Sequence, residues 1–219
     1  MILISPVTVR RRQAEEARRV RQAEEYVNSI RYQLEQIPKW SIKERCNIVK
    51  TYNKIIYCHV PKTAGISFTC LKLCRDIGHN TFYRKTYPDY IAIAVVRNPY
   101  MRFISAYRYL LNGGRGHSID LSYQKIIRRY SSVYHFLNDI ENHKATIEHF
   151  KPQIKLMSEV DIVFRYESLH ELAYLFPSIT ELPRNNITSS NINIELTDKL
   201  KETIYNAYSD DFQLLNYSR

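Results

Sequence analysis

Glycine is scarce in this chain, and long apolar runs are absent. Only 5 of the 219 residues are glycine. Each is therefore expected where the backbone conformation or a close approach disfavours a side chain. No stretch approaches the ~20 apolar residues that cross a bilayer. The segment Met1–Ile4 is far too short for the core of a signal peptide. The sequence therefore predicts no transmembrane segment.

Cysteine is also sparse, and its spacing excludes the common zinc sites. The chain has 4 cysteines, with no C-x-x-C pair and no matching histidine spacing, so we expect no metal. Free cysteine behaves as a small buried hydrophobe. Cys58 falls within a predicted strand, and Cys70 and Cys74 within the buried face of a helix predicted at 66–77. Gly78 is placed to end that helix.

Acidic residues are outnumbered by basic ones. The chain has 32 lysines and arginines against 22 aspartates and glutamates, a net charge of +10. Such an excess indicates an anionic partner: a nucleic acid, a membrane surface, an acidic glycan or a phosphorylated cofactor. Charge alone does not choose among these. The remaining composition is that of an ordinary globular protein.

The N-terminal segment predicts a helical extension over residues 1–38, separate from a domain over 39–219. Apolar residues from Val20 to Ile37 recur in steps of three and four within a helix predicted at 8–37, which Pro38 ends. Arginines and glutamates surround this stripe. A solvated arm that packs one face on the body and a homodimer contact both fit the pattern.

After Trp40 the pattern becomes strand, turn and helix. Apolar runs at 54–60, 91–96 and 161–165 predict buried strands, and the helices between them indicate an α/β fold with a parallel sheet covered on both faces. Right-handed crossovers would place the turns after the first two strands at the same edge of the sheet. The predicted helices lie at 66–77, 99–111, 120–142, 144–158, 167–174 and 195–208.

The first of these turns has the parts of a phosphate-binding loop. Ile55–Val60 runs into Pro61-Lys62-Thr63-Ala64-Gly65-Ile66-Ser67-Phe68. Gly65 lets the backbone approach a ligand, Lys62 supplies a cation, and Thr63 and Ser67 supply hydroxyl groups. The lysine precedes the glycine, unlike that of a nucleoside-triphosphate P-loop. Taken alone, the segment also fits a plain turn between strand and helix.

The second turn adds an arginine and a serine. Ile91–Val96 leads into Arg97-Asn98-Pro99, and Ser105 follows eight residues after Arg97. Arginine offers a planar fork for a phosphate, serine a short donor, and Pro99 suits the first turn of a helix. An arginine-rich surface helix is the alternative. The two turns in this order favour phosphate binding over both plainer interpretations.

Together these segments resemble the carbohydrate sulfotransferases of the heparan sulfate 2-O, 6-O and chondroitin type. The similarity rests on Pro61–Ser67 and on Val96–Tyr107. It continues through weaker matches at His149–Gln153, Val160–Leu169 and Tyr208–Tyr217, and so covers about residues 54–217. Those enzymes have a P-loop NTPase-like three-layer fold and take a sulfuryl group from 3′-phosphoadenosine 5′-phosphosulfate (PAPS).

The resemblance implies a role for each part of the two turns. The first loop would bind the 5′-phosphosulfate, with Lys62 as a catalytic cation, while Arg97 and Ser105 would hold the 3′-phosphate. No metal is required. The chain departs from the family at Ile66, where a hydroxyl residue is usual, and at Met101. The implied set for the donor is Pro61, Lys62, Thr63, Ala64, Gly65, Ile66, Ser67, Phe68, Arg97 and Ser105.

The acceptor hydroxyl needs a general base, and histidine suits this role because its ordinary pKa is ~6.5. In the resembled enzymes the base tends to lie between the two phosphate segments, where this chain has His79. His149 is the alternative, and His59 is expected to be structural. A polar residue at a helix exit is the plainer interpretation of His79.

Recognition of the acceptor is expected from the loop Gly113-Gly114-Arg115-Gly116-His117, with Arg115, His117 and His149 as the expected contacts for an acidic sugar. The sequence thus predicts a PAPS-dependent carbohydrate sulfotransferase without a nucleic-acid partner. A nucleotide phosphotransferase and a non-catalytic polyanion-binding protein are the alternatives. As written, the chain suggests a cytoplasmic bacterial or viral enzyme; a Golgi enzyme trimmed of its anchor would look the same.

Overall fold

A four-stranded parallel sheet forms the centre of the computed structural model, which describes residues 6–157, 159–179 and 192–219. The strands are β1 (Ile55–Cys58), β2 (Arg75–Asp76), β3 (Ile91–Val96) and β4 (Ile162–Arg165). Their spatial order is β2-β1-β3-β4, with Ile55 opposite Ile91 and Ile93 opposite Ile162. The predicted α/β fold with a parallel sheet is confirmed.

Helices cover both faces of the sheet, because alternate residues of each buried strand point to opposite sides. On one face, the side chains of Ile91, Ile93 and Val95 pack with α2 (Ile42–Val49), α3 (Gly65–Thr69) and the 3₁₀ helix η3 (Tyr166–Tyr174). On the other, Ala92, Ala94 and Val96 pack with α8 (Gln153–Leu156) and with Leu215. These are the three layers that the sequence predicts.

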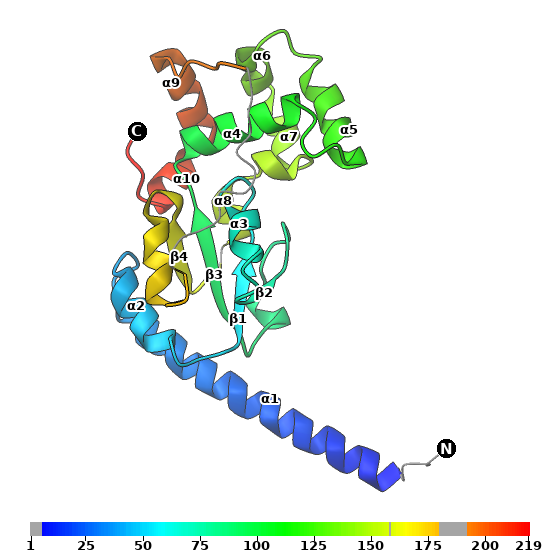
Figure 1. Cartoon of the computed structure of the whole chain (residues 1–219), viewed down its shortest axis with the longest axis vertical. Helices are drawn as coiled ribbons and strands as arrows, with labels where there is room; N and C mark the ends of the chain where they lie inside the picture. Colours follow the sequence, from blue (N-terminus) through cyan, green and yellow to red (C-terminus); the bar gives the residue numbers. More distant parts are fainter. Residues whose placement is uncertain (1–5, 158, 180–191) are drawn as a thin grey trace.

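A separate helical lobe stands beyond the carboxyl edge of the sheet (Figure 1). Its core contains Phe103, Phe136 and Phe150. Only Arg97 and Asn98 separate β3 from helix α4, which carries the chain from the sheet into this lobe. The lobe is built from α4 (Pro99–Leu111), α5 (Ser118–Ile127), α6 (Val133–Asn138), α7 (Ile140–Lys144), η2 (Glu148–Phe150), α9 (Asp198–Ala207) and α10 (Ser209–Leu214).

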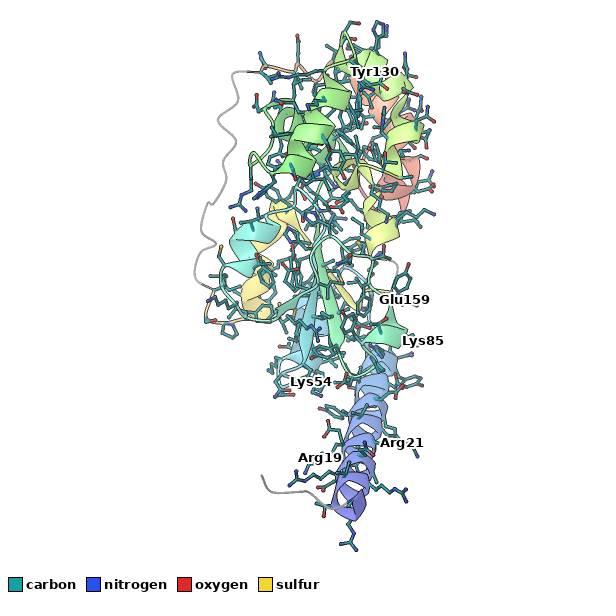
Figure 2. The ribbon with its side chains drawn as sticks, turned by 90° about the vertical axis from the view of Figure 1, so that its right-hand side faces the viewer. Arg19, Arg21, Lys54, Lys85, Tyr130 and Glu159 are labelled. Atoms are coloured by element: carbon teal, nitrogen blue, oxygen red, sulfur yellow. The ribbon has the colours of Figure 1, made fainter. Side chains whose placement is uncertain are left out.

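Helix α1 (Pro6–Glu35) is attached to the body by its C-terminal part only. Val27, Ile30 and Leu34 are buried in the core beside α2, whereas Val9 and Val20 are exposed. Figure 2 shows the part of α1 that carries Arg19 and Arg21 extending beyond the body. Among the described residues, no helix is both long and apolar enough to cross a bilayer.

The helix predicted at 66–77 is wrong. Helix α3 ends at Thr69, Lys72 adopts a left-handed conformation with φ of 52°, and the chain then forms β2, which pairs with β1. Gly78 therefore ends no helix. Cys70 is exposed rather than buried, whereas Cys46 and Cys58 are buried as expected. The consequence is a short fourth strand at the edge of the sheet.

Two long predicted helices are also wrong, since each is broken into shorter pieces. The segment 120–142 contains α5, α6 and the start of α7, and the Ser132 side chain caps α6 by accepting a bond from the His135 amide. The segment 144–158 contains η2 and α8, separated by Pro152, and its last residue lies outside the described part of the chain. The helix predicted at 167–174 is instead the 3₁₀ helix η3, interrupted by non-helical dihedral angles at Ser168. The remaining predicted elements agree to within a few residues at their ends, with η1 (Arg84–Thr86), α2 and α10 as additions.

Candidate functional site

The loop between β1 and α3 has a backbone shape suited to an anion. Lys62 and Ala64 adopt left-handed conformations, with φ of 71° and 68°, while their neighbours in the loop do not. Alternation of this kind turns successive N–H groups toward one side and forms a concave anion-binding nest. Such conformations cost non-glycine residues of order 1–3 kcal/mol each and cluster at functional sites. Because α3 has only five residues, the loop amides supply the donors.

Gly65 is required by a close approach of His59. A Cβ atom built at Gly65 would lie 1.9 Å from Nε2 of His59. Any side chain at this position would therefore displace the imidazole. The missing side chain at Gly65 leaves room for the His59 imidazole against the loop.

Two arginines from the segment that follows β3 hold the loop between β1 and α3 in place. Arg102 is buried and donates from Nε to the Pro61 carbonyl (3.1 Å) and from Nη2 to the Lys151 carbonyl (2.8 Å). Arg97 donates from Nη1 to the Lys62 carbonyl (3.2 Å). The turn after β1 and the turn after β3 thus meet at the carboxyl edge of the sheet, as predicted from right-handed crossovers.

The surroundings of Lys62 lower the pKa of its amine. Its Nζ lies 3.9 Å from the centroid of the Tyr109 ring. Burial and, to a smaller extent, the positive charge of Arg97 lower the pKa of Lys62 to about 8, while Asp120 acts in the opposite direction. The amine is therefore still mainly protonated at neutral pH, and its ammonium is poorly solvated.

Arg97 is fixed on both its backbone and its side chain. Its N–H donates to Oε1 of Gln153 (2.9 Å), and Nε2 of Gln153 donates to the Arg97 carbonyl (2.8 Å). The guanidinium lies 4.2 Å from the centroid of Tyr166. Burial lowers the pKa of Arg97. Ser105 lies two turns along α4 and is partly buried.

Three histidines gather beside the loop. The ring of His79 lies edge-on to those of His59 and His149, at centroid distances of 4.6 and 5.7 Å. Nδ1 of His79 lies 3.1 Å from a carboxylate oxygen of Glu148, and Nδ1 of His59 lies 3.4 Å from Asp76. A carboxylate on Nδ1 fixes the tautomer and leaves Nε2 able to accept a proton.

Their environment keeps two of these imidazoles neutral at pH 7. Burial, followed by the charge of His59, lowers the pKa of His79, and Glu148 only partly offsets this. Burial and nearby cations lower the pKa of His149 to about 3. The His149 ring stacks on Tyr109 at 5.1 Å, and its buried Nδ1 has no partner within the described part of the chain.

The glycine-rich loop is joined to this site through Asp120. This buried carboxylate accepts bonds from the Tyr109 hydroxyl (2.9 Å) and from the Arg115 amide (3.0 Å). A Cβ at Gly114 would lie 2.4 Å from Asp120, so only glycine allows the contact. The side chains of Arg115 and His117 themselves are exposed.

Not every predicted site residue faces the others. Thr63 is buried, and its hydroxyl donates to the Val60 carbonyl (2.8 Å) within the loop. Phe68 lies in the core, 4.7 Å from Tyr57 and 5.7 Å from Phe176 between ring centroids. Lys62, Arg97, His79 and His149 are brought together. Pro61 and Ala64 contribute backbone, Ser67 is buried and Ile66 partly buried.

Sequence reasoning missed six polar side chains of the site: Asp76, Arg102, Tyr109, Asp120, Glu148 and Gln153. Tyr109 follows Ser105 by one helical turn on α4, so the helical period could have indicated it. Glu148 directly precedes His149 in the sequence. Asp76 lies in the segment predicted as helix, and that error concealed its position at the end of a strand.

Comparison with known proteins gives a single result. A family model described as the sulfotransferase family matches residues 45–218. Neither the curated proteins nor the solved structures yielded a significant match. The matched range contains the sheet, the loop and every charged side chain of the site described above.

Proposed function

Because the chain belongs to the sulfotransferase family, we propose that it transfers a sulfuryl group from PAPS to a hydroxyl of an anionic carbohydrate. One observation supports PAPS as the donor. Two partly buried cations, Lys62 and Arg97, lie at the anion-binding nest between β1 and α3, and neither is paired with a carboxylate. No ion pair within the described residues includes either of them. Buried charge of this kind is stabilised by a bound anion.

The residues present fit a donor with two anionic groups. The nest between β1 and α3 and the Lys62 ammonium would hold the 5′-phosphosulfate. Arg97, at the end of β3, and Ser105 would hold the 3′-phosphate. When bound, the donor supplies a sulfuryl group whose bond to the 5′-phosphate oxygen breaks as the acceptor oxygen bonds to sulfur.

The side chains of the site would then perform two tasks. The Lys62 ammonium would neutralise the charge that develops on the leaving phosphate, and transfer of this type depends mainly on positioning and charge neutralisation. His79 would accept the proton of the acceptor hydroxyl, because its lowered pKa leaves it unprotonated at neutral pH. Glu148 holds the imidazole through Nδ1. His149 is the alternative base.

A carbohydrate acceptor is supported by the charge of the chain and by the sequence resemblance. The net charge of +10 favours an acidic glycan. Arg115 and His117, both exposed on the loop tied to Asp120, would contact its acidic groups.

Thermal unfolding with and without 3′-phosphoadenosine 5′-phosphate (PAP), the product of the donor, tests this function. At about 100 times its Kd, PAP should add roughly 2.7 kcal/mol to the free energy of unfolding. Arg97→Ala should abolish the shift, and Arg19→Ala, on the exposed part of α1, should retain it. Stabilisation by ATP–Mg²⁺ instead would indicate a phosphotransferase. A response to heparin alone would indicate a polyanion-binding protein.

A further inference from the structure

Tyr109 contacts two groups of the candidate site, although the proposed transfer gives it no role. Its ring centroid lies 3.9 Å from Nζ of Lys62 and 5.1 Å from that of the His149 ring. The residue lies on α4, one helical turn beyond Ser105. One side chain of the helical lobe therefore touches the cation expected beside the leaving phosphate.

The Tyr109 hydroxyl is held by a buried carboxylate. It donates to Oδ2 of Asp120 at 2.9 Å, and Asp120 is only 4% exposed. Burial and, after it, this hydrogen bond raise the pKa of Tyr109 to about 12, so the hydroxyl keeps its proton and remains a donor. Because the hydroxyl is fixed to α5 and the backbone belongs to α4, the ring cannot turn away from Lys62 without depriving a buried carboxylate of a donor.

The same carboxylate oxygen holds the glycine-rich loop. Oδ2 of Asp120 also accepts from the Arg115 amide at 3.0 Å. Gly114 has a φ of 60°, and a Cβ atom at this position would lie 2.4 Å from Oδ2. Asp120 is thus closely fitted between Tyr109 and the loop that is expected to contact the acceptor.

Opposing charges act on Lys62 from the elements around it. Burial and the charge of Arg97, at the end of β3, lower the pKa of Lys62, whereas the charge of Asp120 on α5 raises it. At pH 7 the His149 imidazole on η2 and the Tyr109 phenol on α4 are both neutral. The π electrons of the Tyr109 ring also attract a cation. Within the described part of the chain, the ammonium is therefore favoured by one carboxylate and one ring face.

We propose that Tyr109 and Asp120 are positioning residues for Lys62, which hold its ammonium at the anion-binding nest and favour its charged form. The proposal rests on the proposed sulfotransferase function, in which Lys62 neutralises the charge on the leaving phosphate. It also connects the acceptor loop with the donor site, because one oxygen of Asp120 binds both the loop and the ring that contacts Lys62.

The affinity for PAP at two pH values, measured by titration calorimetry, tests the role of Asp120. Asp120→Asn keeps an oxygen that can accept both hydrogen bonds and removes the charge. The ratio of the affinity at pH 6 to that at pH 8.5 should be about fivefold larger than for the wild type, because Lys62 would lose its proton at a lower pH. The ratio removes any effect of the substitution that is equal at the two pH values.

Substitutions of Tyr109 test the ring separately. Tyr109→Leu removes the ring face and should also enlarge the ratio, by up to about tenfold, since a desolvated cation–π contact is lost. Tyr109→Phe keeps the ring and should lie closer to the wild type. Asp139→Asn is the matched control, because Asp139 likewise accepts from a tyrosine hydroxyl, that of Tyr130, in the same lobe. Its ratio should equal that of the wild type.

Two further measurements assign the effect to Lys62. In the Lys62→Arg background, Asp120→Asn should leave the ratio unchanged, because arginine keeps its charge over this pH range. In the ligand-free protein, NMR of ¹³C-labelled lysine side chains follows the titration of Lys62 directly, and Lys62→Arg identifies its signal. That signal should titrate at a lower pH in Asp120→Asn and in Tyr109→Leu than in the wild type.

The outcomes separate the positioning pair from the proposed function. Wild-type ratios and lysine titrations in both Asp120→Asn and Tyr109→Leu would overturn the proposal, and so would an Asp120→Asn effect that persists in the Lys62→Arg background. An equal effect of Asp139→Asn would also overturn it, because any disturbance of the lobe would then suffice. If PAP does not bind the wild type, the proposed function fails, whereas the NMR titration still decides whether the pair acts on Lys62.

Discussion

Lys62 is a residue whose charge depends strongly on its surroundings. Its ammonium lies against the Tyr109 ring and near Arg97, and the pKa of about 8 lies well below the ordinary value of 10.5. Below that pH the amine is charged and assists an anion, and above it the charge is lost. Under the proposed function, Lys62 would bind the donor and would make donor binding depend on pH.

From this we predict how PAP affinity varies with pH. The affinity should be constant below pH ~8 and then fall by up to about tenfold per pH unit, since one proton is coupled to binding. Lys62→Arg should keep its charge and remove the fall, because arginine stays protonated. Titration calorimetry from pH 6 to 9.5 measures both. A wild-type affinity that is flat to pH 9.5 would contradict the lowered pKa.

Turnover should respond to the same side chain. Lys62→Ala is expected to lower kcat by ~10²–10³, by analogy with the loss of an oxyanion donor. Tyr32→Ala, on the exposed side of α1, is the control for expression and folding. A Lys62→Ala enzyme with near-normal turnover would remove Lys62 from the mechanism.

At the scale of elements, a buried ionic cluster joins α1 to the sheet. Arg31 donates to Asp161 (3.2 Å), to the Tyr90 carbonyl (2.7 Å) and to the Pro88 carbonyl (3.2 Å). Asp161 also accepts from the Ala92 amide (2.8 Å). The extension is thus held by hydrogen bonds to the backbone around β3 as well as by its apolar face.

Removing Arg31 should therefore destabilise the whole protein. Arg31→Ala leaves Asp161 buried with a weakened counter-charge, a change that typically costs about 3–5 kcal/mol. Arg19→Ala removes an exposed ion pair with Glu15 and should cost well under 1 kcal/mol. Urea unfolding of both variants gives the comparison. Equal stabilities would show that the apolar contacts of α1 alone attach it.

Elements with a strong apolar pattern were predictable, and the others depended on distant contacts. The strands β1 and β3 are runs of buried, mainly apolar residues, and so is β4 from Ile162 to Phe164. Strand β2 contains only Arg75 and Asp76, both exposed, so pairing with β1 rather than any local pattern creates it. In 144–158 the sequence did hold a signal, because Pro152 disfavours helix in the residue before it.

The candidate site likewise contains some residues that could be predicted from the sequence and others that could not. Lys62, Arg97 and His79 belong to local segments with a chemical meaning of their own. The contact of His79 with Glu148 joins residues far apart in the chain, as does that of His59 with Asp76. The contact with Glu148 follows from the packing of the helical lobe against the sheet, and the contact with Asp76 follows from the pairing of β2 with β1. No single segment specifies either.

At the scale of the whole molecule, α1 is divided between body and solvent. Residues 8–22 are exposed throughout, whereas Val27, Ile30 and Leu34 are buried. An isolated helical segment of this length is marginal in water and depends on pairs such as Arg19 with Glu15, 2.8 Å apart. The solvated arm and the homodimer contact considered from the sequence differ in what protects this segment.

Hydrogen exchange distinguishes them. For a solvated arm we predict that the amides of residues 10–22 exchange far faster than those of residues 27–34, at rates that do not change with protein concentration. Local opening should require little free energy where few apolar contacts are made. Protection of 10–22 that grows with concentration, together with a sedimenting mass above 26.1 kDa, would establish the homodimer instead. Val20→Asp would then abolish that protection, because Val20 is a large apolar side chain exposed on this segment.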